Sequence, residues 1–219
     1  MTDTTNLIFA GVGGQGVLLA AQLTAQAAAQ AGFDVKQTEV HGVSQRGGSV
    51  ESHVRYGREV FSPLVMPGQA DVVFGLEKLE ALRFAHYLRL GQADLESGGV
   101  LLVNDHEIIP ASVAGAADQY PHQALAVLQA KPIRVMAAPA SQRARELGDG
   151  RMANIVLLGA LSALLDIREE AWAETLRDGI PARHLPANLR AFHSGRQWAA
   201  QCGGADEPVR PASKDRVAG

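Results

Sequence analysis

Two short stretches near the N-terminus gather the residues whose types could do chemistry. The stretch "GVGGQG" at 11–16 fits the pattern G-x-G-x-x-G through Gly11, Gly13 and Gly16. The stretch "EVHGVSQRGG" at 39–48 combines charged and hydrogen-bonding side chains with three more glycines. Glycine turns expose backbone amides and arginine offers a fixed positive fork, so both stretches predict contact with a phosphate or carboxylate group.

The first stretch joins a strand-like run, 6–11, to a helix-like run, 14–32. In that setting the glycines permit a tight turn, and the free amides of the helix start can bind an anion. The pattern fits a phosphate-bearing ligand such as NAD(P), a contact with a partner chain, or a turn that only lets the helix pack on the strand. An NAD site needs an acidic residue at the end of the second strand, and Glu39 stands a few residues later than usual.

The second stretch follows a run that alternates like a β-strand, 34–40. If 6–11 and 34–40 are neighbouring parallel strands of a doubly wound sheet, both end on its carboxyl edge, where open α/β sheets place their sites. The second stretch then forms half of a polar rim, made by His41, Gln45, Arg46, Gly47 and Gly48. The alternative is a solvated turn in which Arg46 pairs with Glu39 or Glu51.

Strand-like and helix-like runs alternate along the rest of the chain. We expect buried strands and helices at these positions: strands 70–75, 98–105 and 133–139, and helices 76–91, 141–148, 151–166, 168–178 and 186–201. The run 49–63 is interpreted as a β-hairpin around a tight turn at Gly57 and Arg58. This order predicts an α/β fold, a Rossmann-like three-layer domain with a mainly parallel sheet and an added β-hairpin.

The domain organisation follows from composition. We expect a single domain over 1–202 and a flexible tail over 203–219, which is rich in glycine, proline and charge. The chain has 219 residues and a formal net charge of −3, which argues against binding to nucleic acid. The single cysteine excludes a disulfide framework and an iron–sulfur cluster held by this chain alone. Without a signal peptide or an apolar run long enough to span a membrane, we expect a cytoplasmic protein.

No catalytic constellation stands out. Ser44 is not on a G-x-S-x-G elbow, and the seven histidines are scattered without the spacing of a metal site. The catalytic residues therefore stay unknown, and no metal ligand is predicted. The run "NIVLLGALSALL" at 154–165 is apolar around nearly the whole helix, so it is expected in the core or against another subunit.

A family resemblance covers residues 6–165 in matching order. The stretches that carry it are "GVGGQGVLLAAQLTAQAA", "EVHGVSQRGGSVESHVRYG", "SPLVMPGQADVVFGLEKLEALR" and "NIVLLGAL". Together they resemble the gamma-type domain of the 2-oxoacid:ferredoxin oxidoreductases, and among these the small subunits that act on indolepyruvate. The C-terminal third matches less clearly.

The resemblance implies a subunit role that is inactive alone. The complex would decarboxylate a 2-oxoacid oxidatively, with coenzyme A as acyl acceptor and ferredoxin as electron acceptor. Thiamine diphosphate, magnesium and the [4Fe-4S] clusters would lie on a larger partner subunit, with this domain near the entry of coenzyme A. The family motif maps onto these residues: Gly11, Gly13, Gly14, Gln15, Gly16, His41, Gln45, Arg46, Gly47 and Gly48.

Two functions are therefore in competition, beside a third possibility that the chain is only a scaffold module. The first is the small, non-redox subunit of an oxidoreductase for indolepyruvate or another aryl 2-oxoacid, in a complex without nucleic acid or membrane partners. The alternative is a free-standing NAD(P)-dependent Rossmann oxidoreductase that uses the 11–16 loop.

Overall fold

A computed structural model describes residues 4–41, 48–91, 98–108, 121, 123–203 and 209. Its centre is a six-stranded sheet with the strand order β2-β3-β1-β4-β5-β6. The strands are β1 (Thr4–Val12), β2 (Asp34–His41), β3 (Ser49–Gly57), β4 (Val72–Gly75), β5 (Val100–Asn104) and β6 (Arg134–Ala138). Strands β1, β4, β5 and β6 are paired in parallel, whereas β3 is antiparallel to both β1 and β2.

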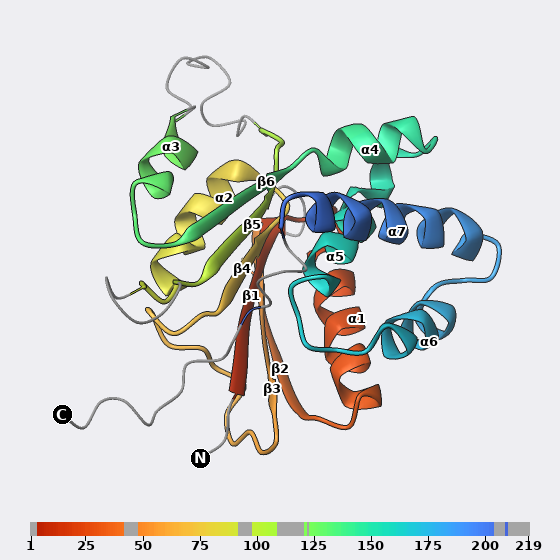
Figure 1. Ribbon diagram of the computed structural model, residues 1–219, viewed down its shortest axis with the longest axis horizontal. Coiled ribbons are helices and arrows are strands. Elements are labelled where there is room, and N and C mark those ends of the chain that lie inside the picture. The colour runs from red at the N-terminus through yellow and green to blue at the C-terminus, as the bar shows by residue number, and fades with distance from the viewer. Residues whose placement is uncertain are drawn as a thin grey trace.

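Helices cover both faces of the sheet (Figure 1). One face carries α1 (Val17–Gln30), α4 (Ala140–Glu146), α5 (Ala153–Ser162), α6 (Glu169–Gly179) and α7 (Leu185–Gln201). The other carries α2 (Lys78–Phe84), the 3₁₀ turn η1 (Ala85–Tyr87) and α3 (Ala124–Gln129). A second 3₁₀ turn, η4 (Gly150–Met152), leads into α5. The three-layer α/β fold with a mostly parallel sheet is confirmed.

The predicted order of strands 6–11 and 34–40 is wrong in one respect. The two strands run in the same direction, but β3 lies between them and pairs with both. The hairpin is also misplaced, because it is formed by β2 and β3 and not within 49–63. Residues 50–57 all belong to the single strand β3. In the described segment 48–91, the next strand after Gly57 is β4.

Most other elements lie where the sequence places them. The predicted helix 76–91 is shorter, because α2 ends at Phe84 and continues only as a 3₁₀ turn. The helix α3 was not predicted, since its short run "ALAVLQ" shows no amphipathic repeat of useful length. The predicted stop of the first helix at Gly32 is correct: Gly32 has φ +93°, a left-handed conformation that ends α1.

The larger core lies under α1, α5 and α7. Helix α5 is buried along its whole length, so the apolar run at 154–165 belongs to the core of this chain. Helices α5 and α7 approach closely at two glycines. A Cβ atom on Gly159 would overlap the carbonyl oxygen of Phe192, and one on Gly195 would overlap that of Val156.

The predicted tail falls mostly outside the described residues. Within it, the amide of Val209 donates a hydrogen bond of 2.8 Å to the carbonyl oxygen of Leu164, and its side chain packs partly buried on the core. The rest of that prediction stays a prediction. Among the helices of the described part, none combines the length and apolar character needed to cross a membrane.

Candidate functional site

The glycine turn after β1 lies at the carboxyl edge of the parallel strands. Gly14 and Gly16 have φ values of +99° and +79°, which L-residues with a side chain rarely adopt. At Gly16 a side chain would also overlap the amide of Asn154. These conformations turn the chain tightly from β1 into α1. Gly16 is the N-cap of α1 and has no side chain to cap it, so the first-turn amides have no intrahelical or side-chain capping acceptor among the described residues.

The two predicted stretches meet through their backbones. The amide of Gly13 donates a hydrogen bond of 2.9 Å to the carbonyl oxygen of Gly48. This bond extends the antiparallel ladder of β1 and β3 beyond its last pair, Val12 and Ser49. The end of the 39–48 stretch, Gly48, therefore does lie beside the glycine turn, although the two meet through β3 and not through β2. The polar rim of His41, Gln45, Arg46 and Gly47 stays a prediction.

Gln15 is turned inward to hold the glycine turn. Its Oε1 accepts a hydrogen bond of 2.8 Å from the amide of Val12, and its Nε2 donates one of 3.3 Å to the carbonyl oxygen of Leu76. Both ends of the side-chain amide are thus used within the chain. Gln15 is better placed to position the turn than to contact a ligand directly.

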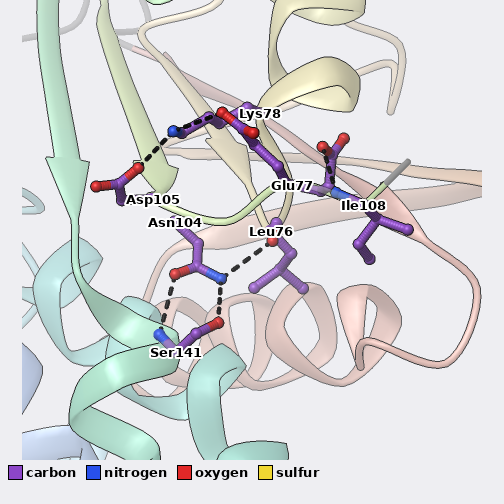
Figure 2. Close-up of polar contacts among 8 residues, drawn as sticks. Leu76, Glu77, Lys78, Asn104, Asp105, Ile108 and Ser141 are labelled. Atoms are coloured by element: carbon purple, nitrogen blue, oxygen red, sulfur yellow. Dashed lines mark hydrogen bonds and ion pairs between the residues drawn. The ribbon is translucent and has the colours of Figure 1, made fainter. Parts of the chain in front are cut away.

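The carbonyl oxygen of Leu76 also accepts a hydrogen bond of 3.2 Å from Nδ2 of Asn104, at the end of β5 (Figure 2). Asn104 is buried, and it bonds twice to Ser141 at the start of α4. Its Nδ2 donates to the Ser141 hydroxyl at 2.8 Å, and its Oδ1 accepts from the Ser141 amide at 3.0 Å. These contacts tie β4, β5, α4 and the glycine turn together along one edge.

A second set of contacts fixes the start of α2 (Figure 2). The buried Glu77 caps this helix, because its Oε2 accepts from the amide of Glu80 at 2.9 Å and its Oε1 from that of Ile108 at 3.1 Å. The ammonium of Lys78 lies 2.6 Å from a carboxylate oxygen of Asp105 and 3.1 Å from one of Glu107. Burial opposes the charge of Lys78, but the hydrogen bonds that it donates to Asp105 and Glu107 raise its pKa overall.

Carboxyl groups lie beside the start of β3, directly after the 39–48 stretch. The Ser49 hydroxyl donates a hydrogen bond of 2.5 Å to Oε2 of Glu80. Glu51, two residues further along β3, has its pKa raised by burial, and the negative charge of Glu80 adds to that rise. Oε1 of Glu51 lies 3.7 Å from Nε2 of His53, whose Nδ1 accepts the amide of Val65 at 3.0 Å. Burial lowers the pKa of His53, which keeps its ring neutral at pH 7.

The structure places the predicted site residues unequally. It brings together these six: Gly11, Gly13, Gly14, Gln15, Gly16 and Gly48. His41 ends β2, where its backbone pairs with Val50. The side chain of His41, and all of Gln45, Arg46 and Gly47, lie outside the described residues. The alternative pairing of Arg46 with a glutamate therefore also stays a prediction.

The NAD alternative loses its main support. A dinucleotide site needs its acidic residue on the strand next to β1, so that it can reach the ribose beside the glycine turn. Glu39 lies on β2, which is separated from β1 by the whole of β3. Its partner in the ladder is Ser52, and Ser52 in turn pairs with Phe9 of β1.

Several residues of this edge were missed by the sequence analysis. They are Glu77, Lys78, Glu80, Asn104 and Ser141. A usable signal existed, because "LEK" follows the strand at 72–75 and "ND" ends the strand at 100–104. Polar residues that directly follow buried parallel strands belong to the same carboxyl edge.

In the described part of this edge, the geometry suits the binding of an anionic group. Free amides at the start of α1 suit a phosphate. No set of three histidine, cysteine, aspartate or glutamate side chains that could hold a metal occurs in the described ranges. The sole cysteine, Cys202, is exposed at the end of α7, far along the chain from the glycine turn.

Comparison with known proteins extends over nearly the whole chain. Residues 6–198 match the model of the family described as pyruvate ferredoxin/flavodoxin oxidoreductase. The indolepyruvate oxidoreductase subunit IorB of Thermococcus kodakarensis is 37% identical over an alignment of 205 residues, which covers 90% of this chain and 96% of that subunit.

Two solved structures share the fold. The gamma subunit of a keto/oxoacid ferredoxin oxidoreductase from Geobacter sulfurreducens superposes with a TM-score of 0.65 at 26% identity, covering 90% of this chain and 99% of that one. A 2-oxoglutarate:ferredoxin oxidoreductase from Magnetococcus marinus, with 2-oxoglutarate, coenzyme A and succinyl-CoA bound, superposes with a TM-score of 0.70 at 24% identity. It matches 96% of this chain with 33% of its own, so the same fold also occurs within a longer polypeptide.

Proposed function

Because the chain belongs to the pyruvate ferredoxin/flavodoxin oxidoreductase family, we propose that it is the small subunit of an oxidoreductase for indolepyruvate or another aryl 2-oxoacid. Such an enzyme oxidatively decarboxylates the 2-oxoacid. The acid releases carbon dioxide, its acyl group forms a thioester with coenzyme A, and two electrons pass to ferredoxin. The match to the Thermococcus kodakarensis subunit over almost its full length supports the assignment as a separate small subunit.

The larger subunit would carry the redox chemistry. Thiamine diphosphate, with magnesium, would supply the electron sink for decarboxylation, and [4Fe-4S] clusters would supply the path for electrons. This chain has one cysteine, too few for a four-cysteine cluster. We propose that the partner is a larger subunit with these groups, that ferredoxin reacts with the assembled complex, and that the complex is cytoplasmic.

The role proposed for this chain is to bind and orient coenzyme A. The observation that carries it is the hydrogen bond from Gly13 to Gly48, which joins the two polar stretches at the carboxyl edge. The uncapped amides at the start of α1 would contact a phosphate of coenzyme A, and the 41–48 stretch, with Arg46, would contribute further polar contacts. Gln15 would keep the turn in the shape that exposes these amides.

Co-expression with the candidate large subunit tests this function. The large subunit, this chain and their mixture would be assayed with indolepyruvate, phenylpyruvate and phenylglyoxylate, using a dye acceptor, coenzyme A and thiamine diphosphate. We expect activity only when both chains are present, and the highest kcat/KM with indolepyruvate. Activity of this chain alone, or full activity of the large subunit without it, would contradict the proposal.

A calorimetric titration tests the NAD(P) alternative directly. Since Glu39 lies two strands away from the glycine turn, neither NADH nor NADPH is expected to bind the isolated chain. Micromolar affinity for either nucleotide would favour the alternative function over the subunit role.

A further inference from the structure

We propose that Ser49 and Glu80 are positioning residues that hold Gly48 against Gly13 and so set the width of the coenzyme A site. This inference rests on the proposed function. It concerns residues that the sequence analysis did not assign to the candidate site, on the face of the sheet opposite α1. Neither side chain is placed in contact with the ligand.

The first observation is the position of Ser49 between two anchors. Ser49 begins β3 directly after Gly48, whose carbonyl oxygen accepts the Gly13 amide at 2.9 Å. Its hydroxyl donates to Glu80 Oε2 at 2.5 Å. The backbone at this point is therefore held from one side by β1 and from the other by α2. Losing the hydroxyl contact would leave Gly48 attached through its backbone alone.

The second observation is that Glu80 is itself fixed. It is only 6% exposed, and its amide donates to the capping carboxylate of Glu77. One residue later, Ala81 packs so closely on Gly75 at the end of β4 that a Cβ on the glycine would overlap it. The carboxyl group of Glu80 thus has a defined place relative to the sheet, and its Oε1 lies 3.4 Å from Nε of Arg83.

The third observation concerns the cost of burying this group. A carboxyl group is seldom nearly buried next to a second one unless it is well hydrogen-bonded, because burial disfavours its charge. Here Glu51 lies close enough for its pKa to be raised by Glu80. An alanine or leucine at position 80 would pack α2 on the sheet without the cost of burying a carboxyl group. The buried carboxyl group of Glu80 is satisfied by the hydrogen bond that it accepts from Ser49 and by its ion pair with Arg83.

The test uses the assembled complex and the variants Ser49→Ala, Ser49→Thr and Glu80→Gln. Ser49→Ala is expected to raise the KM for coenzyme A by about tenfold, as for the loss of one charge-assisted hydrogen bond, with kcat nearly unchanged. Ser49→Thr keeps the hydroxyl and should restore the wild-type KM. Glu80→Gln keeps an acceptor oxygen and should give an intermediate KM, and it remains informative if Ser49→Ala folds poorly.

Hydrogen exchange at the Gly13 amide provides a readout besides activity. In Ser49→Ala this amide should exchange faster than in the wild type, because its acceptor on Gly48 is less firmly held. The matched control is Ser162→Ala in α5, which removes a buried serine hydrogen bond of 2.7 Å to Gly159 and should change neither the KM nor the Gly13 exchange.

Each outcome is decisive for the positioning role. A lower melting temperature with unchanged KM and unchanged Gly13 exchange would show that the Ser49–Glu80 contact only stabilises the fold, and would overturn the inference. Faster exchange with unchanged KM would overturn it as well, since the contact would then hold Gly48 without affecting coenzyme A. If the wild-type complex does not need this chain or coenzyme A, the proposed function fails instead, and the exchange data still report on the contact.

Discussion

The two faces of the sheet differ in the kinds of side chain that are buried on them. The face under α1, α5 and α7 is closed by apolar side chains and by helices that touch at glycines. The face under α2 and η1 has a much smaller apolar cluster, with His53, Asp71 and Glu80 buried among its elements. Apolar packing tolerates many sequences of the right volume, whereas buried polar groups require particular partners. The first face therefore contributes most of the apolar stability of the fold, whereas the second adds buried charged groups, of which Glu80 lies at the carboxyl edge.

The largest expected effect on the free energy of unfolding comes from a substitution on the apolar face. In Gly195→Val, the new side chain would overlap the carbonyl oxygen of Val156 and force α7 away from α5. We expect a loss of at least about 3 kcal/mol in the free energy of unfolding, measured by urea denaturation. The control Gly150→Ala, whose Cβ would meet only a flexible arginine side chain at 3.3 Å, should stay within about 0.5 kcal/mol. Equal effects at both glycines would contradict the close helix crossing.

The second expected effect is a pH dependence of stability that arises from Asp71 on the α2 face. Burial raises the pKa of Asp71, on the α2 face, to about 6, against the opposing effect of the Asn6 amide and Arg89. A carboxyl group with a raised folded-state pKa binds its proton more tightly in the folded protein. Its contribution to stability is therefore full below the unfolded pKa near 4 and declines as pH rises toward 6.

Asp71→Asn removes this titration and keeps an acceptor for the Asn6 amide, which bonds to Oδ2 of Asp71 at 2.9 Å. Between pH 4 and pH 7 the wild type should lose roughly 2 kcal/mol relative to the variant, measured by denaturation at matched pH values. The same difference at every pH would show that Asp71 does not titrate in this range.

The third effect concerns the glycine turn. Gln15→Met removes hydrogen bonds to Val12 and Leu76 while keeping the length of the side chain. We expect a loss of about 1 kcal/mol in stability and a higher KM for coenzyme A in the complex. The exposed Gln142→Met, which loses only a contact to Glu146 on the surface of α4, is the control and should change neither. A changed KM in the control would point to a general effect of added methionine.

The smallest expected change in stability is at Arg46. From the sequence, Arg46→Ala should alter the free energy of unfolding by no more than about 0.5 kcal/mol, as is usual for surface residues. Losing the proposed charge-assisted bond of Arg46 to a phosphate should weaken the binding of coenzyme A by about 1.5–3 kcal/mol, seen as a higher KM. A large drop in melting temperature with normal kinetics would make Arg46 a structural residue.

The same contrast explains what the sequence could predict. Apolar runs such as 6–11 and 154–165 predict buried strands and helices, because burial favours apolar side chains whatever element they pack against. The order of strands could not be read in the same way. Strand β3 carries Glu51, His53 and Arg55 on its α2 side, and nothing local shows that it inserts between β1 and β2. That position depends on pairing across the whole chain.

Only the glycine turn of the candidate site could be predicted from local sequence, for a related reason. The glycine turn has a local signature, since its conformations require glycine. Asn104 and Glu80 act through partners 37 and 31 residues away, Ser141 and Ser49, so their role has no signature within a short window. The family resemblance supplied the motif residues, but only the structure shows that Gln15 turns inward.

The insertion of β3 has a consequence for how this protein can change. The 42–47 stretch connects two adjacent antiparallel strands whose ends are locked in register by the pairing of His41 with Val50. A connection of this kind can gain residues at small cost, about 0.6 kcal/mol for each doubling of its length, because the ladder below it is unaffected. Loops exchanged between relatives at this point should leave the sheet intact. The hairpin thus gives this protein a place where residues of the proposed coenzyme A site could be inserted or exchanged while the sheet stays the same.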